Sequence, residues 1–478
     1  GVAMSIAPIS YNPDVNDSRV FPGSGIGITF TERIKAGSGN ITLSIATNAG
    51  AAGTVVENFG VGSSVTINNN QITIDPTADL NEKETYHISF PAGSFTNTAG
   101  DVDYVGTAYT FGAVNYAIEL WGSGNNTLGE LGANIKGNIS SPVQIPGTTW
   151  NLVASGWEHS LATKTDGTLW TWGENYYGES GQNNRTNYSS PIQIPGSWSS
   201  ISTGLYFSKA LKTNGTLWSW GDNEFGVLGL NQSEPTRYSS PVQVGSDTNW
   251  AATRCMSGRY VSGATKTDGT LWVWGSNTYG MLGQNNTTHY SSPVQIPGTT
   301  WGTDLDGKVT GSGQQASFMS WIKTDGTLWS WGANNVGQFG LNNITQYSSP
   351  VQLPGTTWKC VSSFGYGVAA TKTDGTLWVW GINEYGTLGQ NDRIRRSSPV
   401  QVPGTNWDIC RSAGREAVKA LKTDGTLWAW GNNTYGNLGH NNTVKYSSPV
   451  QLPGTSWDIE GISNSAQNDG YTFAKKKV

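Results

Sequence analysis

The sequence predicts an all-β protein in which a smaller β-sandwich precedes a seven-bladed β-propeller. Glycine and tryptophan are abundant, with 63 and 22 copies, whereas charged residues make up only 13% of the 478 residues. Many tight turns and flat aromatic packing are typical of β-structure rather than of helices. A tandem repeat with a period near fifty residues adds the number of blades.

The repeat is carried by the phrase T-[DN]-G-T-L-W-x-W-G, which occurs six times after a truncated copy, A-I-E-L-W-G, at 117–122. One tryptophan in each copy serves as a marker, with spacings between 48 and 57 residues: Trp121, Trp172, Trp220, Trp274, Trp331, Trp380 and Trp430. Sheets of this size cannot bury both faces alone, but they can when they pack face to face around an axis. The sequence therefore predicts seven blades over residues 114–478.

Each unit has a readable internal order. Asp166-Gly167 and its equivalents predict a two-residue hairpin turn with positive φ at both central positions. The run G-x-N-x-aromatic-G-x-L-G predicts a loop that needs several glycines, and S-S-P-V-Q then begins a short strand. The first copy lacks its hairpin half, and residues 470–475 supply a matching strand. We expect this segment to pair with residues 116–121 and close the ring.

With these motifs, residues 115–478 resemble the regulator of chromosome condensation (RCC1) repeat family, which shares the W-G-x-N-x-x-G-x-L-G signature and the hairpin. The resemblance implies a seven-bladed propeller. The founding nuclear member is an exchange factor for a small GTPase and contacts nucleosomes through a basic tail. Since no basic arm is visible in this chain, that activity is not carried over.

Residues 1–113 contain no copy of the repeat and predict short strands at 25–30, 41–46, 64–69, 71–76, 85–90 and 108–112. Strands at this spacing favour a sandwich. Leu80, Tyr86 and the loop 98–101 make the segment similar to the bacterial Ig-like domain of S-layer and other surface proteins. The resemblance implies a spacer or adhesion module.

The sequence offers no recognisable catalytic, cofactor or metal motif, so we expect a non-enzymatic protein without a cofactor. The four histidines lie in different domains or blades and form no HExxH motif. The repeated aspartates are explained as turn residues, because Asn214 replaces one of them. Asp101 and Asp103 could ligate calcium, although a solvated turn is the interpretation that we favour. The three cysteines (Cys255, Cys360, Cys410) form no CxxC pair, and Cys360 and Cys410 are expected to be buried core residues.

Charge and hydropathy exclude two classes of partner. The net charge is −5, and neither a basic domain nor a basic tail is present, which argues against nucleic-acid binding. No run of about 18 apolar residues occurs, so we expect no membrane insertion.

Binding loops are expected on the rims of the propeller, where the chain departs most from its repeat. The candidates fall into three irregular loops and one aromatic position: Asn231, Glu234 and Arg237; Asp304, Asp306, Lys308 and Gln314; Asp392, Arg393 and Arg395; and Tyr176, Tyr177 and Tyr385. The aromatics, with Phe225, Tyr279 and Tyr435, could form a ring for a sugar or protein. The alternative, which we favour, is that they plug each loop against the neighbouring blade.

The leading functional hypothesis is a structural or recognition protein, displayed outside a bacterium or on a bacteriophage particle as a fibre, tail or decoration component. Its partner would be a protein or a surface glycan, and a place in a larger symmetric assembly fits the same hypothesis. The rivals are a secreted enzyme-inhibitor propeller and a glycan-degrading enzyme. The enzyme would require two facing carboxylates in a cleft.

Overall fold

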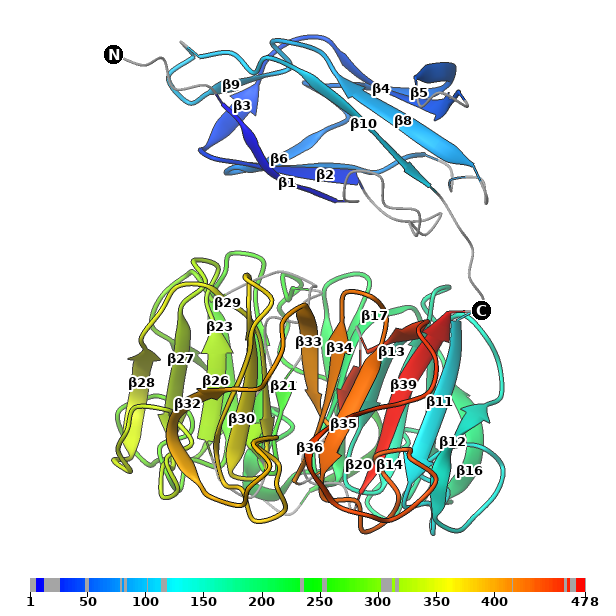
Figure 1. Cartoon of the computed structure of the whole chain (residues 1–478), viewed down its shortest axis with the longest axis vertical. Coiled ribbons are helices and arrows are strands. Elements are labelled where there is room, and N and C mark those ends of the chain that lie inside the picture. The colour runs from blue at the N-terminus through cyan, green and yellow to red at the C-terminus, as the bar shows by residue number, and fades with distance from the viewer. Residues whose placement is uncertain are drawn as a thin grey trace. The chain divides into compact units, whose positions relative to one another are not determined.

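The computed structural model describes residues 6–12, 26–47, 51–77, 80, 84–100, 102–112, 118–232, 236–251, 256–301, 312–313, 318–414, 416–459, 462–464 and 470–477. The chain divides into two compact units, Gly1–Tyr116 and Ala117–Val478. The two units are described separately below (Figure 1).

The N-terminal unit contains two four-stranded sheets and a two-stranded ribbon. One sheet has the order β1 (Pro8–Asn12), β2 (Ile26–Phe30), β7 (Gln71–Ile74), β6 (Thr66–Asn68). The other has the order β10 (Thr107–Gly112), β8 (Thr85–Phe90), β4 (Asn40–Ala46), β5 (Ala52–Gly60). The ribbon pairs β3 (Ile34–Ala36) with β9 (Phe95–Asn97).

The core of this unit comes from strands that bury every second side chain. In β2, for example, Ile26, Ile28 and Phe30 are buried, whereas the residues between them are half-buried. The six strands expected from the sequence correspond to β2, β4, β6, β7, β8 and β10. Strand β5 was not predicted, because residues 52–56 are exposed on both faces and show no alternation.

The C-terminal unit is the predicted propeller: its described residues form seven sheets. Blade 1 combines β37 (Trp457–Asp458), β39 (Tyr471–Lys477), β11 (Ile118–Gly124) and β12 (Ile139–Ile145). Blades 2 to 4 are, from the inner to the outer strand, β13 (Trp150–Ser155), β14 (His159–Lys164), β15 (Leu169–Gly173), β16 (Tyr188–Ile194); β17 (Trp198–Thr203), β18 (Phe207–Lys212), β19 (Leu217–Asp222), β20 (Arg237–Gln243); and β21 (Met256–Ser257), β22 (Val261–Thr265), β23 (Leu271–Gly275), β24 (Tyr290–Ile296). Blades 5 to 7 are β25 (Ser312–Gly313), β26 (Phe318–Ile322), β27 (Leu328–Gly332), β28 (Tyr347–Leu353); β29 (Trp358–Phe364), β30 (Gly367–Lys372), β31 (Leu377–Gly381), β32 (Arg396–Gln401); and β33 (Trp407–Ser412), β34 (Ala417–Lys422), β35 (Leu427–Gly431), β36 (Tyr446–Gln451).

The first strands of neighbouring blades contact one another around the axis, as β13 contacts β17 and β29 contacts β33. A short strand, β38 (Ile462–Asn464), adds in parallel to β13, and a single 3-10 turn, η1 (Glu224–Gly226), follows β19. The outer strands carry S-S-P-V-Q, or S-S-P-I-Q in blade 2, in which the proline removes one donor from the edge of the sheet.

The ring closes as expected from the sequence. Strand β39 pairs along its whole length with β11 in antiparallel register, from Ile118 opposite Lys477 to Gly124 opposite Tyr471 (Figure 1). The first blade therefore contains strands from both ends of the repeat array.

The hairpin turn within each blade differs from the two-residue turn that we expected. In blade 2 the Lys164 N–H donates to the Thr168 carbonyl (3.0 Å), which leaves a three-residue loop at 165–167. Gly167 has φ 77°, whereas Asp166 is not among the residues with positive φ. The physical reason is the Asp166 carboxylate, which accepts the Thr168 N–H (2.9 Å) and so favours a type I turn followed by a glycine bulge.

Candidate functional site: the loop rim of the propeller

Each blade has two ends with different loops. One end, termed the turn rim, carries the short turn between the second and third strands, such as 165–167 in blade 2. The other end, termed the loop rim, carries the long loop between the third and fourth strands, such as 382–395 in blade 6. The long loops lie at the lower end of the propeller in Figure 1, and they hold every described candidate residue except Arg237, which begins the strand after one of them.

The turn rim is occupied by a repeated side-chain network. In blade 6 the Asp374 carboxylate accepts the Thr376 hydroxyl (2.6 Å), and that hydroxyl accepts the indole N–H of Trp378 (2.8 Å). The Lys372 ammonium lies over both Trp378 (4.5 Å) and Trp358 (4.7 Å). The hydrogen bonds from Thr376 lower the pKa of Asp374. Blades 2 to 7 repeat the arrangement, and Asn214 makes the same bonds in blade 3, so the repeated aspartates are turn residues, as the sequence indicated.

The first half of each long loop fastens one blade to the next. In blade 6 the Asn383 side chain accepts the Leu388 N–H (2.9 Å) and donates to the Ile394 carbonyl (3.1 Å). The indole of Trp430, in blade 7, donates to the Thr387 carbonyl (2.8 Å). A Cβ on Gly386 would lie 2.5 Å from Ser447 of blade 7, which explains the glycine. This half of the loop is therefore fixed by the packing of blades.

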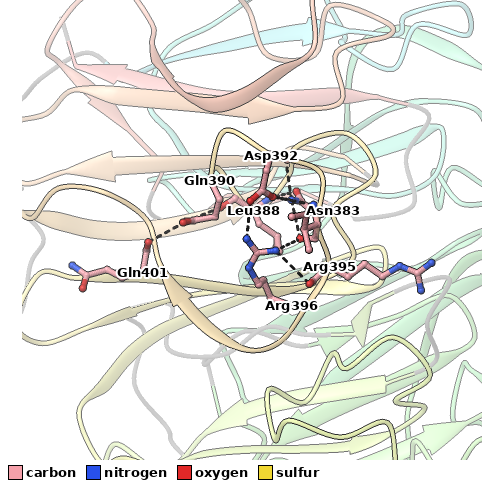
Figure 2. A network of polar contacts seen from close by, with 8 residues as sticks. Asn383, Leu388, Gln390, Asp392, Arg395, Arg396 and Gln401 are labelled. Carbon is pink, nitrogen blue, oxygen red and sulfur yellow. Dashed lines mark hydrogen bonds and ion pairs between the residues drawn. The ribbon is translucent and has the colours of Figure 1, made fainter.

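The second half of the blade 6 loop contains the ion pair of Asp392 with Arg396, and Figure 2 shows Arg395 beside it. The Asp392 carboxylate bonds the Arg396 guanidinium (2.7 Å) and accepts the Ile394 N–H (2.9 Å). Although burial opposes ionisation, these donors hold the pKa of Asp392 below its usual value. Arg395 points away from this network in Figure 2. Across the described ranges, no carboxylate lies within ion-pair distance of Arg393 or Arg395.

Three other candidates, Tyr176, Tyr177 and Arg237, meet in a second cluster. The Tyr177 ring stacks on Tyr206 of the neighbouring blade (4.4 Å), and the Arg237 guanidinium lies over Tyr177 (4.4 Å). Arg237 is paired with Asp222 (3.0 Å). Burial raises the pKa of Tyr177. Tyr176, which is 58% exposed, contacts the edge of Tyr177.

These contacts show how the loop aromatics are used. Phe225 packs on Tyr260 of the next blade (5.0 Å), Tyr385 is covered by the Lys445 ammonium (4.4 Å), and a Cβ on Gly470 would meet Tyr435. Tyr177, Phe225 and Tyr385 thus contact the neighbouring blade, which supports the plug interpretation for these three, whereas Tyr176 packs on Tyr177 of its own loop. Among the three candidate tyrosines, Tyr176 is the most exposed.

The remaining candidates have other placements. The Asn231 N–H donates to the Ser291 carbonyl of the next blade (2.9 Å), and its side chain accepts the Ser292 hydroxyl (3.1 Å), so Asn231 fastens two blades. Glu234, Asp304, Asp306, Lys308 and Gln314 lie outside the described residues, as do Asp101 and Cys255. Asp103 bridges Thr96 through its backbone.

Buried carboxyl groups on the loop rim escaped the sequence reasoning. Glu179 is fully buried, and its Oε2 accepts the Tyr177 N–H (2.8 Å). Burial raises the pKa of Glu179 to about 7. Glu174 is hydrogen-bonded to Glu158, and its pKa is raised by burial and by the charges of Glu179 and Glu130. Gln338 occupies the Glu179 position in blade 5 and makes the same bond. Comparison of the repeats could therefore have identified Glu179 from the sequence.

Within the described residues, no group of three or more His, Cys, Asp or Glu side chains could hold a metal ion. Cys360 and Cys410 are buried free thiols, as expected. Nor does any helix in the described ranges have the length and apolar character needed to span a membrane.

Comparison with known proteins agrees with this geometry. The model of the bacterial Ig-like domain matches residues 5–113. The model of the regulator of chromosome condensation (RCC1) repeat matches 166–211, 214–264, 268–302, 325–369, 374–413 and 424–463, and a second RCC1 repeat model matches 151–179 and 198–227.

Solved structures show the same fold. Human WBSCR16 is 18% identical, with a TM-score of 0.63, over 76% of this chain and 99% of its own. Prp20p from Saccharomyces cerevisiae is 18% identical, with a TM-score of 0.63, over 76% of this chain and 92% of its own. An Ig-like domain joined to such a propeller indicates a binding or surface-associated protein. The repeat matches span more than half of the chain, which therefore belongs to the RCC1 repeat family and carries an N-terminal bacterial Ig-like domain.

Proposed function

We propose that this chain is a non-enzymatic recognition protein, displayed on a bacterial surface or a bacteriophage particle, which binds a protein or glycan through its loop rim. The division of each long loop carries the proposal. The first half holds the next blade, as the Trp430 indole holds the Thr387 carbonyl, and it varies little between blades. The second half varies from blade to blade and bears exposed side chains. A rigid frame with variable outer segments is the usual design of a binding repeat protein.

Two of the comparisons add support. The Ig-like domain is of a bacterial type and is consistent with surface display. Prp20p, which shares the propeller fold, has binding properties to Gsp1p and histones. A propeller of this fold thus serves protein binding in another organism.

The glycan-degrading alternative depends on Glu158 and Glu174, the acidic pair of the loop rim. Glycosidases hold their two carboxyl groups about 5 Å apart or more, so that a sugar or a water fits between them. A side-chain hydrogen bond joins Glu158 and Glu174, so the two carboxyl groups are in direct contact. Direct contact leaves no space for a sugar or a water between them, which disfavours this alternative.

Location is tested by mass spectrometry of purified virions, of the cell-surface fraction and of the secreted fraction from the producing culture. We expect the chain in virions or at the cell surface. Recovery from the cytosol alone contradicts surface display.

Catalysis is tested by incubating the full chain with a panel of polysaccharides and measuring the release of reducing ends. We expect none above background. Release that disappears in the double variant Glu158→Gln, Glu174→Gln would replace the binding proposal with an enzymatic one.

A further inference from the structure

Exposed aliphatic side chains in the propeller gather in one segment of the long loops. Among the described residues of the propeller, the large aliphatic side chains classed as exposed are Ile344 (66%), Ile394 (63%), Val444 (54%) and Ile135 (47%). All four follow, within three residues, the asparagine that fastens the loop to the next blade: Asn342, Asn391, Asn441 and Asn134. The four residues occupy the same loop segment, although not the same position within it.

The four residues lie on consecutive blades, 5, 6, 7 and 1. The Asn342 N–H donates to Ser397 of blade 6 (2.8 Å), and the Asn391 N–H donates to Ser447 of blade 7 (2.7 Å). The Asn441 N–H donates to Ser140 of blade 1 (2.8 Å) across the closure of the ring. The exposed aliphatics therefore lie on four successive blades along an arc of the loop rim.

Cations accompany the aliphatic residues along this arc. Arg393 and Arg395 flank Ile394, Lys445 follows Val444, and Lys136 follows Ile135. None of these four cations forms an ion pair within the described residues, although the Lys445 ammonium already lies over the Tyr385 ring (4.4 Å). The acidic residue of the blade 6 segment, Asp392, is already paired with Arg396 (2.7 Å).

The other side of the rim lacks this combination. The equivalent segments read Asn184-Arg185-Thr186 in blade 2 and Asn286-Thr287-Thr288 in blade 4, without an apolar residue. Charges of both signs occur on both sides of the loop rim, because Arg185 is exposed on blade 2 and Glu384 is exposed on blade 6. What distinguishes the arc is that exposed aliphatic side chains accompany its cations.

The chemistry of the arc selects among partners. Branched aliphatic side chains strengthen binding when an apolar surface of the partner removes them from water. A sugar or a nucleotide backbone offers little apolar surface. The unpaired guanidiniums and ammoniums need carboxylates or similar anions. A protein that presents acidic and apolar side chains together satisfies both demands.

We propose that the outer loop segments of blades 5, 6, 7 and 1 form an aliphatic and basic docking arc for an acidic protein segment that carries apolar side chains. The arc consists of Ile344, Arg393, Ile394, Arg395, Val444, Lys445, Ile135 and Lys136. This inference rests on the proposed binding function of the loop rim and names the class of partner.

The test uses the full chain and two labelled peptides of equal length and charge, one built from repeats of Glu-Leu-Glu-Ser and one from repeats of Glu-Ser-Glu-Ser. Affinity is measured by fluorescence anisotropy at low and high salt. We expect the leucine peptide to bind roughly tenfold more tightly, because its side chains cover the aliphatic residues. The triple variant Ile344→Ser, Ile394→Ser, Val444→Ser removes this advantage.

The charged part of the arc is tested separately. The variant Arg393→Gln, Arg395→Gln weakens both peptides at low salt and reduces their salt dependence. The control variant Arg185→Gln, Thr287→Ser alters the same loop positions on blades 2 and 4 and leaves both affinities unchanged. Circular dichroism checks that all variants fold.

Several outcomes overturn the inference. Equal affinity for the two peptides, or no measurable binding of the leucine peptide, removes the aliphatic contribution. Tighter binding of polygalacturonate or of a single-stranded DNA oligonucleotide, insensitive to the triple variant, assigns the arc to an acidic glycan or a nucleic acid. If the peptide experiment fails but the chain is found in virions, the docking proposal is wrong and surface display is still supported. If the chain is found in the cytosol alone, surface display is wrong and the peptide result is unaffected.

Discussion

The two rims of the propeller are built from the same repeat, yet they use their side chains differently. On the turn rim, Asp374, Thr376, Trp378 and Lys372 satisfy one another, and five other blades repeat this closed set. On the loop rim, each loop begins with a fixed half and ends in a half that differs from blade to blade. The difference teaches that repetition by itself does not mark function. Binding residues are expected where the side chains of a rigid repeat are exposed and do not stabilise the fold.

The largest expected effect is the loss of stability when a buried tryptophan, rather than a half-buried one, is replaced by alanine. Trp380 is fully buried and donates to the Gln338 carbonyl of the preceding blade (2.8 Å). Trp380→Ala should lower the free energy of unfolding by about 3–5 kcal/mol, measured by urea denaturation. Trp378→Ala, at the half-buried turn rim, is the control and should cost clearly less. Equal losses would mean that the two rims do not differ in this way.

The second prediction concerns pH, to which the rims respond with opposite sign. The pKa of Glu179 is raised by burial from 4.5 to about 7, so the folded state holds its proton while the unfolded state loses it. Stability should therefore fall as the pH rises from 4.5 to 7. Glu179→Gln should remove this slope and add about 3 kcal/mol at pH 8, measured by denaturation at several pH values.

The turn rim provides the contrast for that measurement. The pKa of Asp374 is lowered by its bonds from Thr376, so its contribution is present at neutral pH and is lost as the pH falls below 3.8. Asp374→Asn, the natural choice at Asn214, should reduce the loss of stability in acid. If the variant loses stability below pH 3.8 as the original chain does, Asp374 does not cause that loss.

A smaller effect is expected from the hydroxyl that links the turn. Thr376→Val keeps the shape of the side chain but removes the acceptor of the Trp378 N–H (2.8 Å) and the donor to Asp374 (2.6 Å). The free energy of unfolding should fall by about 1 kcal/mol. Thr376→Ser, which keeps the hydroxyl, is the matched control in the same denaturation experiment.

The smallest effect is expected where side chains are free. Ile394 is 63% exposed, so Ile394→Ser should change the free energy of unfolding by less than about 0.5 kcal/mol. A loss of more than about 1 kcal/mol in the free energy of unfolding would show that the second halves of the long loops also stabilise the fold. The comparison between fixed and variable halves would then fail.

Much of the fold could be predicted from the sequence, because the marker tryptophans and glycines report the blade directly. The composite first blade followed from the missing hairpin at 117–122 and the strand at 470–475. The turn type was wrong, since the Asp166 carboxylate favours a three-residue loop that a dipeptide pattern does not reveal.

The site was harder to predict, because the contacts that decide it cross from one blade to the next. The sequence marks Tyr177 and Asn231 as unusual, but only the neighbouring blade shows that Tyr206 covers the first and Ser291 holds the second. Conversely, Ile344 and Val444 look ordinary within their own repeats. Their significance appears once the ring places them on adjacent blades.

The pairing of β11 with β39 also sets an order of events during synthesis. These partners are separated by more than three hundred residues, so six blades' worth of chain leaves the ribosome before the ring can seal. Contacts of such separation make folding slow, and until then β11 lacks its neighbour on one side. The nascent protein is therefore expected to be most vulnerable to aggregation and to proteases shortly before its last strand emerges.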